Sequence, residues 1–182
     1  MERKVLGTVL PLVMVLALFW GACGGGGGGT KLVEVCLVEY DHWEKTDLPD
    51  PDMSNLEGTY TLYSFDIDVW LDGVHTGMPI SSSDFSSFSG TLVLTSNTLT
   101  ESVTLEGESA TTTGTYTVSA SSSVAGTLHV TLPEGVTDVI CAMGSVQIGD
   151  TVHYFMTFQS EMVCEMVAED ELLEPSFQGI GH

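Results

Sequence analysis

The stretch TVHYFMTFQ, residues 151–159, decides the fold class, because apolar and polar side chains alternate along most of it. The stretch TLHVTL, residues 127–132, alternates in the same way, with leucine and valine on one side and threonine and histidine on the other. A period of two residues is typical of a β-strand that packs one face on a core and exposes the other. Both stretches are therefore predicted to be half-buried strands.

Similar short runs rich in Thr, Val, Tyr and Leu recur from residue 56 onward, separated by Gly, Ser, Asn or Asp. They cover residues 58–71, 89–95, 98–107, 112–120, 126–133, 136–148, 151–159 and 162–169. The connections are short enough for hairpins, and nothing between the runs supplies the crossover helices that parallel pairing needs. We therefore expect an all-β domain over residues 56–170, an eight-stranded antiparallel up-and-down barrel, with a two-sheet β-sandwich as the alternative.

The segment before this region, KLVEVCLVEYDHWEK at residues 31–45, is dense in valine and leucine. Its propensities favour a strand, whereas the spacing of its apolar residues also permits a short helix, and both interpretations stay open. The stretch DLPDPD, residues 47–52, contains two prolines and is expected to be an extended acidic linker. Residues 32–55 are thus predicted to form an N-terminal segment and linker before the barrel, and residues 171–182 a C-terminal tail.

The N-terminus has the layout of a secretory signal, with basic residues at positions 3 and 4, an apolar run over residues 5–20, and small residues before Cys23. As a helix the apolar run would span roughly 24 Å, short of the ~30 Å hydrocarbon core of a bilayer, so cleavage is expected. The stretch FWGAC, residues 19–23, resembles the cleavage site of a bacterial lipoprotein signal. That resemblance implies removal of residues 1–22 and a lipid-modified Cys23 at the new N-terminus.

Six glycines, residues 24–29, follow Cys23. A glycine run has no side chains to bury and loses much backbone entropy on folding, so residues 23–31 are predicted to be a lipidated tether with a reach of roughly 15 Å. We therefore expect a cell-envelope protein whose partner is the lipid bilayer, through an acylated Cys23. No aspartate follows the cysteine, and within the lipoprotein resemblance this favours the outer membrane, with the periplasmic or surface face left open.

The large excess of acidic over basic residues limits which partners the chain can bind. The 182 residues contain 4 Lys and Arg against 25 Asp and Glu, a net charge of −21, and no Lys or Arg occurs from Gly58 to His182. So anionic a chain repels phosphate and lacks the cations that displace counterions, which excludes most nucleic-acid functions. Membrane residence must come from acyl chains, because no basic patch is available for anionic lipids.

Three stretches of the strand region carry a family resemblance. LEGTYTLYS at residues 56–64, GTYTV at 114–118 and IGDTVHYF at 148–155 resemble strands of bacterial lipocalin-like domain lipoproteins. Tyr60 stands where that family usually has tryptophan, and this region has no arginine to pack across the ring. Another segment must therefore close this end of the barrel, and the candidate is the one with Cys36, Tyr40 and Trp43.

Barrels of eight strands are either filled by their own side chains or hold one small ligand. Glu101 shares its alternation phase with Leu99, Val103 and Leu105, so a carboxylate is expected inside unless a bulge turns it outward. We expect an envelope lipoprotein that binds a small neutral or cationic hydrophobic ligand, since no cation is available to hold an anionic one. The alternative is a structural or interaction lipoprotein with a solid barrel core and no ligand. The candidate ligand-binding residues are Tyr60, Leu62, Glu101, Val103, Tyr116, Tyr154, Met156 and Phe158.

Besides Cys23, three cysteines remain for a disulfide in an oxidising envelope. Cys141 and Cys164 fall on runs two strand spacings apart, beyond the ~7 Å that a bridge tolerates between Cα atoms. Cys36 is therefore expected to pair with Cys164 or with Cys141, and the pair Cys36–Cys164 is preferred.

The sequence contains no nucleophile elbow, phosphate-binding loop, zinc-type His/Glu motif or paired CxxC. His129 and His153 are expected on the solvent side of their strands, and the acidic clusters do not match the spacing of a known calcium loop. We therefore expect a non-enzymatic protein without a cofactor or metal site, and the sequence names no protein partner.

Overall fold

The computed structural model describes residues 31–45, 52–133 and 135–168. None of these residues belongs to a helix that is long and apolar enough to cross a membrane. The described elements are β1 (Leu32–Lys45), β2 (Gly58–Leu71), β3 (Val74–His75), β4 (Ile80–Ser81), the 3-10 turn η1 (Ser82–Asp84), β5 (Phe88–Leu94), β6 (Thr98–Leu105), β7 (Glu108–Ala120), β8 (Ala125–Leu132), β9 (Gly135–Ile148), β10 (Thr151–Gln159) and β11 (Val163–Ala168).

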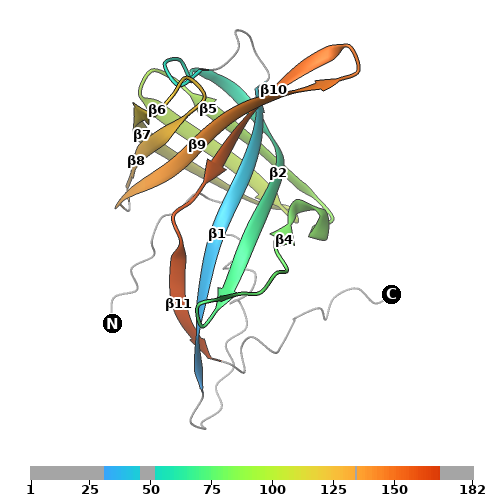
Figure 1. Cartoon of the computed structure of the whole chain (residues 1–182), viewed down its shortest axis with the longest axis vertical. Helices are drawn as coiled ribbons and strands as arrows, with labels where there is room; N and C mark the ends of the chain where they lie inside the picture. The colour runs from blue at the N-terminus through green and yellow to red at the C-terminus, as the bar shows by residue number, and fades with distance from the viewer. Residues whose placement is uncertain (1–30, 46–51, 134, 169–182) are drawn as a thin grey trace.

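Eight strands close into an antiparallel barrel in the order β1, β2, β5, β6, β7, β8, β9, β10 (Figure 1). Closure comes from β1, which pairs with β2 on one side and with β10 on the other. The predicted all-β class and the up-and-down barrel are confirmed. The alternative sandwich is wrong, because two separate sheets would leave open edges where the ladder here is continuous.

The barrel starts earlier in the chain than the predicted boundary at residue 56. The segment whose strand or helix character the sequence left open is β1, the first barrel strand. The predicted last barrel run, residues 162–169, is instead β11, which pairs with the beginning of β1 outside the closed cylinder. β1 has 14 residues, enough to pair with β11 over its first half and with β10 over its second, so β11 is not needed for closure.

Beyond the barrel, β1, β2 and β11 continue as a twisted antiparallel extension (Figure 1). β5 pairs with β2 only over residues 58–61, whereas β1 pairs with β2 from Val35 to Lys45. The N-terminal end of β1 therefore lies at the tip of the extension, away from the closed barrel.

A bulge at Tyr63 keeps both halves of β2 facing the core. Across the β1–β2 ladder Trp43 lies opposite Leu62 and Asp41 lies opposite Phe65, which leaves one extra residue on β2. Because side chains alternate along a strand, one extra residue exchanges the inward phase for the outward one. The apolar residues on both sides of the bulge consequently point inward.

One hydrophobic cluster fills the interior of the barrel. Gly90 shows how little room it leaves, because a Cβ atom at this position would lie 2.8 Å from Cβ of Leu62 and 3.3 Å from Cη2 of Trp43. Interiors at crystal-like density contain few voids larger than a water molecule. The barrel is therefore a packed core rather than an open cup.

The segment after the linker closes one end of the barrel. Met53 and Leu56 are both 3% exposed and belong to the core cluster. The backbone N–H of Met53 donates to the carbonyl oxygen of Ser123, 3.0 Å away in the β7–β8 turn. These contacts place two apolar side chains across the barrel mouth.

A lysine supplies the cation that the strand region lacks. Lys45 Nζ, at the end of β1, lies 5.1 Å from the centroid of the Tyr60 ring, within reach of a cation–π contact.

The segment with Cys36, Tyr40 and Trp43, which was predicted to close this end of the barrel, contributes only in part. Trp43 is fully buried in the core, but Cys36 and Tyr40 belong to the opposite, outward phase of β1.

Candidate functional site: the carboxyl groups of the barrel interior

Three carboxyl side chains are buried in the described chain. Glu39 and Asp41 on β1 are each 1% exposed, and Glu101 on β6 is 3% exposed. The buried residues of the described ranges include no lysine, arginine or histidine. Burying a carboxyl group is costly in free energy, so these three groups are the chemically unusual part of the described chain.

Glu101 lies inside the barrel because of the regular alternation of β6. Leu99, Val103 and Leu105 share its phase and are each at most 6% exposed, while the threonines and serine between them are half-buried. No bulge interrupts the pairing of β6 with β5 or β7. The inward orientation of Glu101 follows from the position of one acidic residue in an otherwise apolar phase.

A cavity of about 20 Å³ lies beside Glu101. That volume admits about one water molecule and is far below the roughly 300–1,000 Å³ of small-molecule sites. Two hydroxyl groups, those of Thr112 and Thr137, belong to residues of its wall. The lining residues are Leu92, Leu99, Glu101, Thr112, Val130, Leu132, Thr137, Val139 and Phe158.

Asp41 approaches the same region from β1. It lies directly opposite Phe158 in the β1–β10 ladder, and Phe158 lines the cavity with Glu101. The Oδ1 atom of Asp41 is buried and makes no hydrogen bond. Burial, and after it the negative charge of Glu101, raises the pKa of Asp41 well above its ordinary value of 3.8. The two groups therefore oppose each other's ionisation.

Glu39 lies where the chain leaves the barrel. Its backbone N–H donates to Oγ of Ser160 at 3.0 Å, and the backbone N–H of Ser160 donates to the carbonyl oxygen of Glu39 at 3.0 Å. Ser160 follows β10 and is 5% exposed. This reciprocal pair fixes the start of the β10–β11 connection against β1.

Most of the predicted ligand-binding residues are core residues. Only Glu101 and Phe158 of the eight line the cavity. Tyr154 is partly exposed on β10. The other residues of the predicted set are buried, at most 6% exposed, and packed in the barrel: Tyr60, Leu62, Val103, Tyr116 and Met156.

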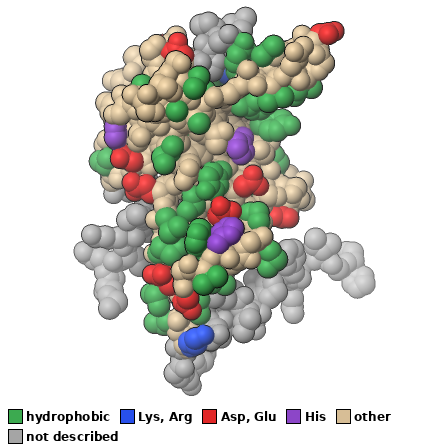
Figure 2. Space-filling view, in the orientation of Figure 1, with side chains coloured by type: hydrophobic (Ala, Val, Ile, Leu, Met, Phe, Trp, Pro, Cys, Tyr) green, Lys and Arg blue, Asp and Glu red, His purple; other side chains and the backbone are tan. Residues whose placement is uncertain are grey.

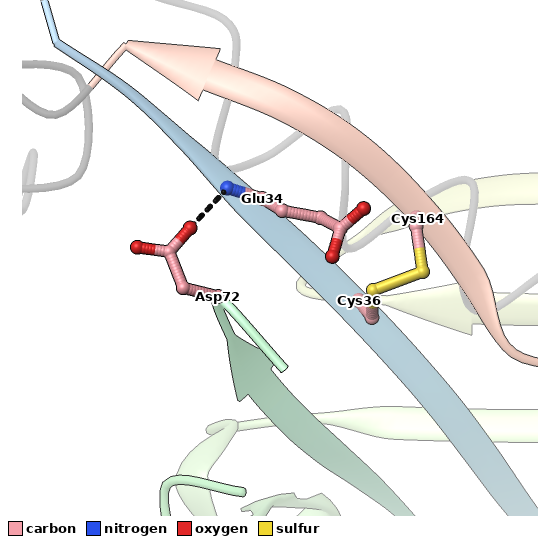
Figure 3. Close-up of a disulfide and its surroundings, with 4 residues drawn as sticks. All are labelled: Glu34, Cys36, Asp72 and Cys164. Atoms are coloured by element: carbon pink, nitrogen blue, oxygen red, sulfur yellow. Dashed lines mark hydrogen bonds between the residues drawn. A yellow bond between two sulfur atoms is a disulfide. The ribbon is translucent and has the colours of Figure 1, made fainter. Parts of the chain in front are cut away.

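A disulfide joins Cys36 of β1 to Cys164 of β11 (Figure 3). This is the pair preferred from the sequence, and the two residues lie directly opposite each other in the ladder. A carboxylate oxygen of Glu34 lies within 4.8 Å of both sulfur atoms, the one group of three close metal-ligating atoms among the described residues. Because the sulfur atoms are bonded to each other, they are not available as thiolate ligands.

Cys141 is buried and outside the disulfide. Burial raises the pKa of its thiol to about 12. A thiol with so high a pKa supplies little thiolate at neutral pH, and thiolate is the reactive form. Cys141 is therefore an inert core residue.

The described histidines lie on the outer surface, each against a carboxylate of a neighbouring strand. Figure 2 shows histidine side chains beside acidic ones on one face of the molecule. Among the described residues these pairs do not gather into a group of three close metal-ligating atoms. They are His42 with Asp66 at 3.8 Å, His75 with Asp68 at 3.4 Å, His129 with Asp138 at 2.6 Å, and His153 with Glu44.

No protein-family model, curated protein or solved structure matches the chain. The predicted signal peptide, the lipidation site Cys23, the glycine run and the C-terminal tail lie outside the described residues.

Proposed function

We propose that this chain is a lipid-anchored protein of the cell envelope whose barrel is a filled, non-catalytic scaffold that acts through its outer surface. The observation that carries the proposal is the packed interior, with a cavity of about 20 Å³. A hydrophobic ligand of amphiphile size would have to displace several core side chains. The packing therefore favours a structural or interaction role over carriage of a hydrophobic ligand.

The sequence of residues 1–31 supports the lipid anchor. β1 begins at Leu32, and its N-terminal end lies at the tip of the extension (Figure 1). A glycine-rich tether of eight residues reaches roughly 15 Å. An anchor at Cys23 would therefore hold the extension toward the bilayer and the closed barrel away from it. The outer membrane is the favoured location.

The charge of the chain indicates the kind of protein partner. A net charge of −21 creates a field that attracts cationic groups and repels anionic ones. Electrostatic complementarity of this kind speeds encounter and selects partners by sign. We propose a partner with a basic contact surface. At the level of fold, the eight-stranded barrel supports the proposed likeness to lipocalin-like domain lipoproteins.

The anchor is tested by labelling bacteria that express the chain with a palmitate analogue. The wild-type protein should carry the label and partition into detergent, and C23A should do neither. Equal labelling of C23A would overturn the anchor. Crosslinking in intact cells should then recover a partner with a basic contact surface, and addition of salt before crosslinking should weaken that capture.

The filled barrel is tested by thermal unfolding with a panel of hydrophobic dyes and fatty amines. The proposal expects flat melting temperatures across the panel. A saturable rise of several degrees that is lost in F158A would instead support a hydrophobic ligand and contradict the filled scaffold.

A further inference from the structure

A disulfide and a carboxylate lie together on the outward face of the extension (Figure 3). Glu34 and Cys36 are two residues apart on β1, so both side chains point to the same face. Cys164 lies directly opposite Cys36 on β11, with the two Cα atoms 4.0 Å apart. One carboxylate oxygen of Glu34 and the two sulfur atoms lie within 4.8 Å of one another. The ladder therefore brings three potential metal ligands to one point.

The disulfide is open to attack from solution. Cys36 is 4% exposed, but Cys164 is exposed. β11 pairs with β1 on one side, and its other edge has no partner strand in the described ranges. Exposed disulfides are in general the labile ones. The β1–β11 ladder itself extends over six residue pairs, so the backbone keeps the two cysteines opposite each other after the bond is broken.

We propose that the reduced chain binds one zinc ion through the thiolates of Cys36 and Cys164 and the carboxylate of Glu34. In the reduction step a dithiol is oxidised to a cyclic disulfide, and its two hydrogen atoms pass to the sulfur atoms of Cys36 and Cys164. Zn²⁺ then displaces one proton from each thiol, because the thiolate is the form that binds a metal. A water molecule completes the four-coordinate site, and the zinc ion holds β11 against β1 in place of the disulfide.

The types of ligand select zinc among the common metal ions. Thiolates select ions such as Zn²⁺ and Cu(I), whereas Ca²⁺ and Mg²⁺ take oxygen ligands. Zinc also accepts a carboxylate oxygen beside sulfur, but a carboxylate is a poor ligand for the softer Cu(I). The third ligand, Glu34, therefore favours Zn²⁺ over Cu(I).

The charges around the three ligands also favour a divalent cation. Asp72, in the turn after β2, accepts a hydrogen bond on Oδ1 from the backbone N–H of Glu34 at 3.0 Å (Figure 3). This bond holds a second carboxylate close to the start of β1. The whole chain has a net charge of −21, and a field of that sign attracts cations.

The test compares the oxidised and the reduced full chain, both with C23A, which removes the one cysteine outside the described residues. A phosphine, itself converted to its oxide, reduces the bond and is removed by gel filtration without oxygen. Atomic spectroscopy counts the bound zinc, and competition with a coloured chelator gives the affinity. We expect one Zn²⁺ per reduced chain and none per oxidised chain. Co²⁺ in place of zinc should give the intense near-ultraviolet band of a thiolate complex.

The variant E34Q should weaken zinc binding to the reduced chain by about tenfold or more. The matched control is E165Q, because Glu165 is also an exposed acid of the extension but lies on the face of β11 opposite to Cys164. C164S should bind no zinc. C141S should bind zinc as wild type does, because Cys141 is buried in the core and outside the disulfide.

Zinc should also raise the melting temperature of the reduced chain by several degrees, because a ligand that binds only the folded state stabilises it. Equal affinity of E34Q and E165Q, or equal zinc binding by the oxidised and the reduced chain, would overturn the site. If C164S does not fold, E34Q against E165Q decides the matter, because both variants keep Cys36 and Cys164. None of these outcomes depends on the lipid anchor or on a filled barrel.

Discussion

Asp41 and Glu101 point into the same barrel interior from β1 and β6, and the charge of Glu101 adds to burial in raising the pKa of Asp41. The alternation of the sequence predicted that Glu101 points inward, but it did not predict the same for Asp41. Their burial in a barrel without a buried basic residue in its described parts makes the stability of this fold depend on pH.

Acidification should favour the folded state through Asp41. Its folded-state pKa lies above the ordinary 3.8, so the folded chain holds this proton more tightly than the unfolded chain. The stability from Asp41 is complete below pH 3.8 and is lost as pH rises through the raised pKa. D41N should therefore be more stable than wild type at about pH 7.5 and lose that advantage at about pH 3. Urea unfolding at several pH values measures the difference, and an advantage that stays constant with pH would contradict the assignment.

Addition of one methyl group at Gly90 should destabilise the barrel. A Cβ atom there would lie 2.8 Å from Cβ of Leu62, and overpacking of this kind costs about 1–3 kcal/mol. The matched control is G144A on β9, where a Cβ atom meets nothing within 4 Å. Urea unfolding compares the two variants, and equal free energies of unfolding would mean that the interior has more room than described.

Truncation of Met53 should open one end of the barrel. This side chain is 3% exposed, and replacing a buried methionine by alanine costs about 2–5 kcal/mol. M78A is the control, because Met78 is 75% exposed and should change stability by less than about 0.5 kcal/mol. A neutral M53A in chemical unfolding would show that the segment over residues 52–57 does not close the barrel.

Loss of the Cys36–Cys164 disulfide should lower stability through the unfolded state. The bond spans 128 residues, and removal of a native disulfide typically costs about 2–5 kcal/mol. The variant C36S/C164S should show this loss in urea, and a phosphine reductant should destabilise wild type but not the variant. C141S should respond to the reductant as wild type does. A reductant effect that persists in C36S/C164S would exclude this bond as the cause.

The eight runs predicted as strands from residue 56 onward are all strands of the structure, because each alternates between Gly, Asn or Asp punctuation. β1 could not be assigned by the same rule. Its outward phase contains Cys36 and Val38, which are buried, so both phases look apolar. The predicted start of the barrel at residue 56 was wrong for that reason, because β1, which closes the barrel, shows no clear two-residue alternation in its sequence.

The undecided strand or helix character of β1 also prevented a prediction that Glu39 and Asp41 are buried. Glu101 was identifiable because it interrupts a clean apolar phase, whereas Glu39 and Asp41 lie in a segment whose strand or helix character the sequence left open, so no inward phase could be assigned to them. The contact of Lys45 with Tyr60 was missed likewise, because it joins the end of β1 to the start of β2. The signal that could have revealed Glu39 and Asp41 is their spacing of two residues from each other and from Trp43, which places all three on the same face of a strand.

Native mass spectrometry of the protein extracted from bacterial envelope membranes decides whether the barrel is filled. A packed interior predicts the mass of the processed, lipidated chain alone. A further mass of roughly several hundred daltons, held without a covalent bond, released on unfolding and reduced in F158A, would contradict it, because such a molecule needs a cavity many times larger than about 20 Å³.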